Sequence, residues 1–300
     1  MPPSRRADRP YIEPTQLDEA LLRAWSLPLD DHGDKKTRGT VLVIAGSTTT
    51  AGAALLAGTA ALRMGAGRLQ IATAEPIAMD LSIAMPEAMV LPLAVGTDNQ
   101  LVPGCADDEL AELVSDAQAI LVGPGMVGSD AIHAIVGLIM MQISRDAILV
   151  ADAAALRSVA STELIATRSV AERLLLTPNR DELAELARLL RVDANIDPSM
   201  PVARELAGVV TCFGDVTAYD GRRWRAVAAT PGLGTSGSGD VLAGLAAGAA
   251  ARCGDPAQAA CWATYVHAAA GNRLSDRFGT TSFIARELLA EVPYVLANLD

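Results

Sequence analysis

The stretch PGLGTSGSGDVLAGLAAG, residues 231–248, places four glycines before Asp240 and an apolar, helix-like run after it. A glycine-rich turn that opens a helix gathers unpaired backbone N–H groups at the positive end of the helix dipole. Because glycine has no Cβ, these amides can converge on a phosphate group. Asp240 stands at the predicted helix start, where a carboxylate can cap the first turn or take a proton from a group held beside the anion.

The glycine spacing also matches the dinucleotide-binding fingerprint, but the surrounding sequence does not support that interpretation. Residues 232–237 fit G-x-G-x-x-G, but a second helix-like stretch follows residues 254–256, where a Rossmann unit needs a strand and a ribose-binding acid. The stretch also lacks the Gly-Lys-Ser/Thr of a P-loop. Taken alone, it is equally compatible with a tight turn capped by Asp240.

Composition and charge narrow the class of protein and of partner. The 300 residues are 51% hydrophobic and 20% charged, which predicts a folded chain with a sizeable core. The net charge of -11 disfavours nucleic acid or an anionic membrane surface as a partner. No signal-peptide core or transmembrane-length apolar stretch is present, and four scattered cysteines fit reduced thiols in a cytoplasm. An anionic ligand would then depend on local amides, a few arginines or a bound metal cation.

Apolar strands alternate with helices along most of the chain. The continuous apolar run Thr40–Ala45 is typical of a central parallel strand. A helix over Ala53–Met64 and a strand over Arg68–Thr73 follow it, which is the opening unit of an open α/β sheet. The same pattern predicts later strands at residues 117–122, 147–151, 173–176, 209–212, 216–219 and 224–228, and helices at residues 130–142, 181–190, 241–252, 256–275 and 285–297.

The segment before this sheet has a different character. Residues 1–14, rich in arginine and proline, are predicted to form a flexible arm. Residues 15–25 are predicted to form a short helix capped by Thr15. Because no linker or internal repeat interrupts residues 15–300, we expect them to form a single domain.

Polar or glycine-rich loops follow several of the predicted strands. In an open parallel sheet such loops share one edge, where ligands bind. Their alignment with the glycine-rich stretch favours a binding site over a turn with no further role. The loops are Gly46-Ser47, Gly123-Pro124-Gly125, Asp152 and Thr177-Pro178-Asn179.

Several short motifs occur in an order and spacing that resemble a known family. They are KTRG at 36–39 with VLVIAGS at 41–47, GAA at 52–54 with GAG at 65–67, GPG at 123–125, TPxxxE at 177–182, TSGSGDVLAG at 235–244 and YVHAAAG at 265–271. Together they make the chain similar, from about Leu22 to its C-terminus, to the ADP-dependent NAD(P)H-hydrate dehydratase family of the ribokinase-like superfamily. The resemblance implies a ribokinase-like three-layer α/β/α sandwich with a mostly parallel central sheet.

The resemblance also implies an enzyme that repairs nicotinamide nucleotides. Its substrates would be (S)-NADHX and (S)-NADPHX, in which the reduced nicotinamide ring carries an extra hydroxyl. ADP, or alternatively ATP, would phosphorylate that hydroxyl, with Mg²⁺ accompanying the nucleotide. Elimination would then restore NADH or NADPH, releasing phosphate and, in the ADP case, AMP. Such enzymes work mainly by positioning and charge stabilisation, and the family habit points to a homo-oligomer, with a tetramer expected.

Site residues follow from the matched motifs. The resemblance makes Asp240 the base that removes the hydroxyl proton. It places Ala53, Gly125, Asn179 and Asp240 against the hydrate. It places Phe213, Gly214, Asp215, Val216, Thr217, Gly237, Ser238 and Gly239 along the nucleotide. No protein ligand to a metal is implied, because phosphate oxygens and water would carry Mg²⁺.

Four positions depart from the usual family pattern. Phe213 stands where the family has lysine, Asn179 where it has histidine, Ala154 where it has aspartate, and Val127 where it has glycine. Loss of one charged phosphate contact costs about a few kcal/mol, which slows catalysis without abolishing it. Two alternatives stay open: a ribokinase-like kinase acting on a sugar or hydroxymethylpyrimidine, and a nucleotide-binding paralogue with little turnover.

Three further titratable residues lie in the matched segments. His267 sits among helical alanines, where a packed, hydrogen-bonded role is favoured over a ligand role. Glu182 near a helix start is explained by first-turn dipole stabilisation, with a contact to Mg²⁺-bound water as the alternative. Asp152 ends a buried strand, and its pattern does not separate loop structure from pocket lining.

Overall fold

The computed structural model describes residues 13–28, 37–105, 107–167, 169–193 and 197–299. A ten-stranded sheet with the order β1-β10-β9-β8-β7-β6-β5-β2-β3-β4 organises these residues. Every neighbouring pair is parallel except the two that involve β9. The strands are β1 (Thr15–Leu17), β2 (Thr40–Ile44), β3 (Arg68–Ala74), β4 (Ala88–Leu93), β5 (Ala119–Val122), β6 (Ile148–Ala151), β7 (Leu174–Leu176), β8 (Val209–Cys212), β9 (Asp215–Ala218) and β10 (Arg223–Ala226).

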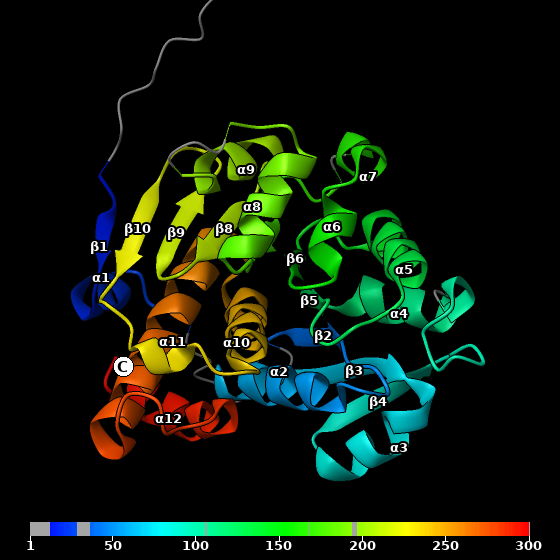
Figure 1. Cartoon of the computed structure of the whole chain (residues 1–300), viewed down its shortest axis with the longest axis horizontal. Coiled ribbons are helices and arrows are strands. Elements are labelled where there is room, and N and C mark those ends of the chain that lie inside the picture. Colours follow the sequence, from blue (N-terminus) through cyan, green and yellow to red (C-terminus); the bar gives the residue numbers. More distant parts are fainter. Residues whose placement is uncertain (1–12, 29–36, 106, 168, 194–196, 300) are drawn as a thin grey trace, which may run out of the picture.

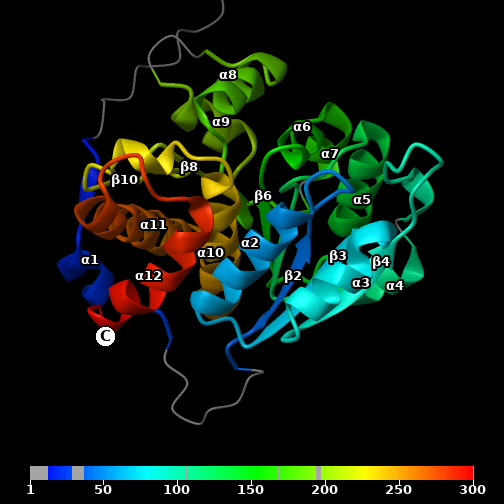
Figure 2. The same cartoon turned by 60° about the horizontal axis from the view of Figure 1, so that its bottom comes forward.

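Helices cover both faces of the sheet (Figure 1). Helices α2, α10, α11 and α12 lie on the face that Figure 2 turns forward, and α4, α5, α6, α8 and α9 lie behind it. The α-helices are α1 (Glu19–Ala24), α2 (Ala51–Arg63), α3 (Glu75–Ala84), α4 (Asp108–Asp116), α5 (Ser129–Gln142), α6 (Ala155–Val159), α7 (Thr162–Thr167), α8 (Arg180–Leu189), α9 (Ser199–Glu205), α10 (Ser238–Cys253), α11 (Pro256–Phe278) and α12 (Ala285–Ala297), and short 3₁₀ turns span Pro103–Cys105 and Pro231–Leu233.

The alternation of side chains along β2 shows why the central strands are apolar throughout. Val41 and Val43 join the core beneath α2, α10 and α11. Leu42 and Ile44 point the other way, into the core beneath α4 and α5. A strand covered on both faces buries successive residues in opposite layers, so no polar position interrupts it. The predicted three-layer α/β/α sandwich is confirmed.

Close packing of α10 against α2 fixes the position of the glycine-rich stretch. A Cβ on Gly244 would lie 2.2 Å from the Ala57 carbonyl oxygen, and one on Gly248 would lie 2.5 Å from that of Ala61. Only glycine allows the two backbones to approach this closely. The first turn of α10 is thereby held against α2 and α12, since a Cβ on Gly237 would lie 2.7 Å from Leu56 Cδ1 and 3.2 Å from the Ala285 Cβ.

The strongly periodic segments are confirmed within one or two residues at most ends, but the predicted first helix is wrong. Thr15–Leu17 forms edge strand β1, paired in parallel with β10. The helix starts at Glu19 and its cap is Asp18, whose Oδ1 accepts the Leu21 N–H at 2.9 Å. Pairing with an open sheet edge satisfies the backbone of Thr15, which local periodicity could not reveal. Helices α3, α4, α6, α7 and α9 and strand β4 were not predicted.

Two further expectations concern the N-terminal arm and membrane-spanning segments. Residues 1–12 of the predicted arm lie outside the described residues, so the division into an arm and one domain stays a prediction. No helix in the described ranges has the length and apolar character that a bilayer crossing requires.

Candidate active site

Two glycine loops meet where the order of strands reverses across the sheet. From β2 the chain moves outward to β3 and β4, then returns to β5 on the other side of β2. The loops after β2 and β5 touch, because the Gly46 N–H donates to the Pro124 carbonyl oxygen at 2.8 Å. In open α/β sheets this reversal point, at the carboxyl ends of the strands, forms the ligand crevice. It defines the candidate site.

Ala53 and Gly125, both predicted to line the hydrate pocket, lie side by side at this point. Gly125 has φ +62, and a Cβ added to it would lie 2.6 Å from the Ala53 Cβ. The Thr50 hydroxyl donates to the Gly125 carbonyl oxygen at 2.5 Å and fixes the loop. The close approach requires a small residue at both positions, so the walls here are mostly backbone.

Asp240 lies in the first turn of α10. The helix begins at Ser238 after Gly237, which has φ +86 and is the N-cap. The alternative role of Asp240 as a cap is therefore wrong, because the carboxylate lies three residues beyond that position. Within the described part of the chain, no hydrogen bond or ion pair engages this half-buried carboxylate. Burial raises the pKa of Asp240.

The start of α10 is open on one side and clamped on the other. A Cβ on Gly239 would meet nothing within 4 Å, so the backbone there faces open space. Ser238 is buried, and its Oγ lies 2.9 Å from His267 Nε2 on α11. The same nitrogen lies 3.1 Å from the Ser238 carbonyl oxygen. Burial lowers the pKa of His267 to about 4, which keeps the ring neutral near pH 7, and its predicted packed, hydrogen-bonded role is confirmed.

Asp152 contributes a second carboxyl group to this edge. It is buried at the end of β6 and accepts a hydrogen bond from the Thr177 hydroxyl at 2.8 Å. Its pKa is raised to about 8, chiefly by burial and also by the charges of Glu182 and Asp240, against the lowering effect of the hydrogen bond from Thr177. Asp152 is thus mainly protonated at neutral pH, and its charge coupling to Asp240 places the two carboxyl groups in one neighbourhood.

Asn179 and Glu182 together cap α8. Asn179 Oδ1 accepts the N–H groups of Asp181 and Glu182 at 2.9 Å each. Glu182 Oε2 in turn accepts the Asn179 N–H at 2.8 Å, which completes a capping box. The structural explanation of Glu182 is confirmed. The amide nitrogen of Asn179 keeps its donor capacity, and its contact with the hydrate stays a prediction.

The predicted nucleotide strip begins in the hairpin that joins β8 to β9. Phe213 and Gly214 form its two-residue turn with φ of +54 and +88. The Phe213 side chain is 79% exposed. Val216 and Thr217 are fully buried in β9, so neither residue offers surface to a nucleotide in this structure. The nucleotide contacts of the strip stay a prediction.

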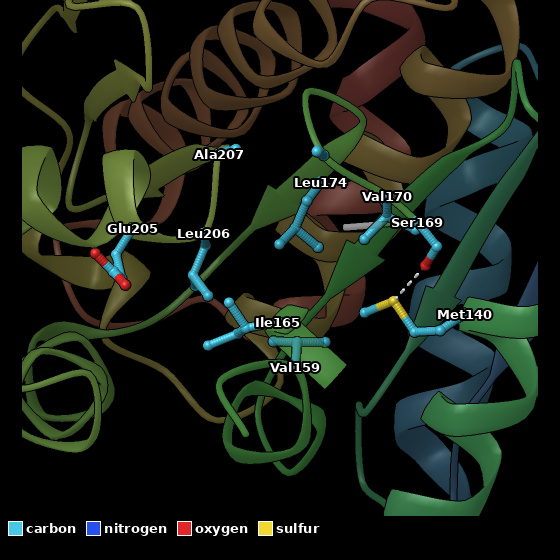
Figure 3. Close-up of a pocket in the computed structure, with 10 residues that line it drawn as sticks. Met140, Val159, Ile165, Ser169, Val170, Leu174, Glu205, Leu206 and Ala207 are labelled. Atoms are coloured by element: carbon cyan, nitrogen blue, oxygen red, sulfur yellow. Dashed lines mark hydrogen bonds between the residues drawn. The ribbon is translucent and has the colours of Figure 1, made fainter. Parts of the chain in front are cut away.

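One hollow away from this edge is too small for the nucleotide, and a second hollow lies at the edge itself. The hollow in Figure 3 holds about 20 Å³ and is lined by residues such as Met140, Val170 and Leu206. It lies at the amino ends of β7 and β8, opposite the edge of Asp240, and has room for roughly one water molecule. A hollow of about 200 Å³ lies between α6 and α8 at the Asp240 edge, with Ala154 and Glu182 in its wall.

Sequence reasoning missed two long-range contacts of this edge. The pairing of His267 with Ser238 brings together α11 and α10, and only the helical HxxxG pattern hinted at it. The guanidinium of Arg180 lies over the Phe213 ring at 3.6 Å, and nothing in the local sequence indicates this contact. Among the described residues, no three His, Cys, Asp or Glu side chains converge to hold a metal ion.

Comparisons with known proteins agree with this geometry. The family model described as NAD(P)H-hydrate dehydratase matches residues 41–294. The ADP-dependent (S)-NAD(P)H-hydrate dehydratase of Xanthomonas campestris is 42% identical over 93% of this chain and 95% of its own. The chain also matches bifunctional NAD(P)H-hydrate repair enzymes, of whose length it spans about half, such as 56% of that of Salinibacter ruber.

Solved structures show the same fold. The ADP/ATP-dependent NAD(P)H-hydrate dehydratase of Bacillus subtilis, co-crystallised with ATP and Mg²⁺, aligns over 96% of this chain and 100% of its own, with a TM-score of 0.76 and 25% identity. A ribokinase-like superfamily protein of Enterococcus faecalis aligns over 98% of this chain and 99% of its own, with a TM-score of 0.80 and 21% identity. The chain therefore belongs to the NAD(P)H-hydrate dehydratase family, within the ribokinase-like fold.

Proposed function

We propose that the chain is an ADP-dependent (S)-NAD(P)H-hydrate dehydratase. The observation that carries this proposal is the half-buried carboxylate of Asp240, which has no hydrogen-bond or ion-pair partner among the described residues, beside the open backbone at Gly239. A carboxylate with no protein partner is available to accept a proton from a bound hydroxyl. The adjacent amides at the helix start are available to a phosphate. The 42% identity with the Xanthomonas enzyme supports the same activity.

The first step is phosphoryl transfer from ADP to the ring hydroxyl. The hydroxyl oxygen forms a bond to the β-phosphorus as its proton passes to Asp240. The bond from that phosphorus to the bridging oxygen breaks, and AMP leaves with the electron pair. The raised pKa of Asp240 makes it a better proton acceptor than an exposed aspartate, while amides around residues 237–239 stabilise the transferring group.

The second step is elimination of phosphate. The ring nitrogen supplies its electron pair, the carbon–oxygen bond breaks, and phosphate leaves. Loss of a proton from the neighbouring ring carbon then restores the dihydropyridine. Phosphorylation makes this step possible because phosphate is a far better leaving group than hydroxide. The packed walls around Ala53 and Gly125 would hold the ring so that the reacting oxygen stays near Asp240.

The same edge would accommodate both substrates. The hydrate would occupy the reversal point between β2 and β5, with Asn179 contributing its amide. The nucleotide would extend toward β7 and β8, where Phe213, Gly214 and Asp215 form the outer wall. Mg²⁺, if carried by the nucleotide, would be held by phosphate oxygens and water, because no metal-binding cluster is found among the described residues.

One assay tests the activity. Purified protein is incubated with hydrated NADH or NADPH, Mg²⁺, and either ADP or ATP, and the absorbance of the reduced nicotinamide is followed. Recovery of absorbance with release of AMP from ADP supports the proposal. Phosphate transfer to a sugar or hydroxymethylpyrimidine without recovery would instead support a kinase. Nucleotide binding without either product would support a binding protein.

We also propose a cytoplasmic homo-oligomer, with a tetramer as the expected state. Cys105, Cys212, Cys253 and Cys261 are all free, which fits a reducing compartment. Burial raises the pKa of each of these thiols, so they stay protonated near neutral pH. Light scattering coupled to size exclusion measures the number of protomers directly.

A further inference from the structure

Phe213 adopts a backbone conformation that bulky residues rarely adopt. It is the first of the two turn residues between β8 and β9, with φ +54. Such two-residue turns favour Asn, Asp or Gly at this position, because a side chain at positive φ is strained. The ring is 79% exposed, so no core contact offsets the strain. Strain of this kind, without packing to explain it, points to a role in a site.

One cation lies over a face of the Phe213 ring. The Arg180 guanidinium carbon lies 3.6 Å from the ring centroid, within the range of a cation–π contact. Arg180 opens α8 after the short loop that follows β7, and Phe213 directly follows β8, the neighbouring strand. Both residues therefore lie at the carboxyl edge of the sheet that also carries Asp152.

Two carboxylates that lie close to this pair in the sequence are engaged elsewhere. Asp215 accepts two hydrogen bonds from Arg225, at 2.6 and 2.8 Å. Glu182 accepts the backbone N–H of Asn179 at 2.8 Å. Over the ranges that the structure describes, no carboxylate pairs with Arg180. Its planar set of N–H donors is held over the ring and remains available to an external anion.

The carboxyl edge of the sheet is acidic, so an anionic ligand needs a free cation there. Asp152, Glu182 and Asp240 are close enough for the charges of the last two to raise the pKa of the first. Burial raises the pKa of Cys212 to about 11, Arg180 opposes that rise, and Glu182 adds to it, so Arg180 and Glu182 share one electrostatic neighbourhood. A nucleoside diphosphate entering an acidic edge needs a fixed cation, and a guanidinium suits phosphate geometry.

We propose that Arg180, stacked on Phe213, binds a phosphate group of the nucleoside diphosphate. Arg180 is a nucleotide-binding residue, and Phe213 is a positioning residue that acts through it. The inference rests on the proposed dehydratase function, since it names the cation that the ADP site uses.

Binding of ADP and of adenosine by the full chain tests the inference. Arg180→Gln is expected to weaken ADP binding about tenfold or more, the usual effect of losing a hydrogen bond to a charged group. Adenosine, which has no phosphate, is expected to bind within about twofold of the wild type. Arg180→Lys keeps the positive charge but not the planar set of N–H donors, and its ADP affinity is expected to lie between those of the wild type and Arg180→Gln. Arg188→Gln, on the same helix and paired with Glu185, is the matched control.

The role of Phe213 is tested by combining substitutions. Phe213→Leu alone is expected to weaken ADP binding about threefold, and adding it to Arg180→Gln is expected to cause no further loss, because one residue acts through the other. Equal weakening of ADP and adenosine by Arg180→Gln, additive losses in the double variant, or unchanged ADP binding would each overturn the inference. A wild-type protein that turns over hydrated NADH while Arg180→Gln binds ADP normally refutes this inference alone. A wild type that does not bind ADP refutes the proposed function as well.

Discussion

His267 on α11 holds Ser238 at the start of α10, with its Nε2 2.9 Å from the serine hydroxyl and 3.1 Å from the serine carbonyl oxygen. A neutral ring thus ties the turn that carries Gly237, Gly239 and Asp240 to a second helix. The first turn of a helix otherwise leaves its N–H groups without intrahelical partners. The clamp fixes the direction in which these groups point, which is what a phosphate site requires.

We expect Ser238 and His267 to stabilise the fold as a coupled pair. Ser238→Ala should lower the free energy of unfolding by about 1 kcal/mol, and His267→Ala by about 1 to 3 kcal/mol, since it also leaves a cavity. The double variant should lose less than the sum, by about 0.5 to 1.5 kcal/mol. Urea unfolding of the four proteins measures the coupling. Strict additivity would show that the contact contributes nothing.

Gly239→Ala should separate ligand binding from folding. Because an added Cβ meets nothing within 4 Å, the substitution should leave the free energy of unfolding unchanged or raise it by about 0.5 to 1 kcal/mol. The same methyl group would occupy the space where we place a phosphate, so ADP affinity should fall about tenfold or more. Calorimetric titration with ADP checks this.

Gly137→Ala in α5 is the matched control for that variant. Its added Cβ also meets nothing within 4 Å, but it lies in a helix away from the carboxyl edge. It should gain a similar amount of stability and bind ADP as the wild type does. Normal ADP binding by Gly239→Ala would show that the phosphate does not bind at this turn.

Asp240→Asn should retain ADP binding and lose most turnover, by about a hundredfold or more, because the amide cannot accept the hydroxyl proton. Burial raises the pKa of Asp240, so wild-type turnover should decline as pH falls through that raised value, where the base becomes protonated. Steady-state recovery of reduced nicotinamide against pH checks both points. Asp276→Asn, on the exposed part of α11, serves as the control, and undiminished turnover in Asp240→Asn would contradict the assignment.

The layered fold could be predicted because it depends on local patterns, and the same kind of pattern places the candidate site at the glycine-rich turn, which stays a prediction. The apolar run of β2 indicates a buried strand, and the glycines before Asp240 indicate a turn with a freely shaped backbone. Both signals lie within a few residues. Edge strand β1 was missed because Thr15 pairs with Trp224, far along the chain. The contact between Arg180 and Phe213 was missed for the same reason, since a hairpin tip and a helix start meet only after the sheet forms.

Asp152 should make the stability of the protein fall as pH rises toward neutrality. Its pKa is about 8 in the folded protein against an ordinary value of 3.8 for aspartate, so the folded state keeps a proton that the unfolded state releases. The stabilisation from this proton is complete below pH 3.8 and is lost as pH rises through about 8. His267 has the opposite effect, because its lowered pKa of about 4 costs stability only as pH falls below 6.5. Between pH 6.5 and about 8, Asp152 therefore changes the free energy of unfolding with pH and His267 does not.

Asp152→Asn isolates this contribution, because the amide fills the same space and can still accept the Thr177 hydroxyl. Relative to the wild type, its free energy of unfolding should rise by up to about 1.4 kcal/mol per pH unit between roughly pH 5 and 8, and level off above that. Urea unfolding at several pH values gives this difference directly, with Asp276→Asn as the reference for an exposed carboxylate. A constant difference across the range would mean that Asp152 is ionised in the folded protein, and that the crevice beside Asp240 carries two negative charges instead of one.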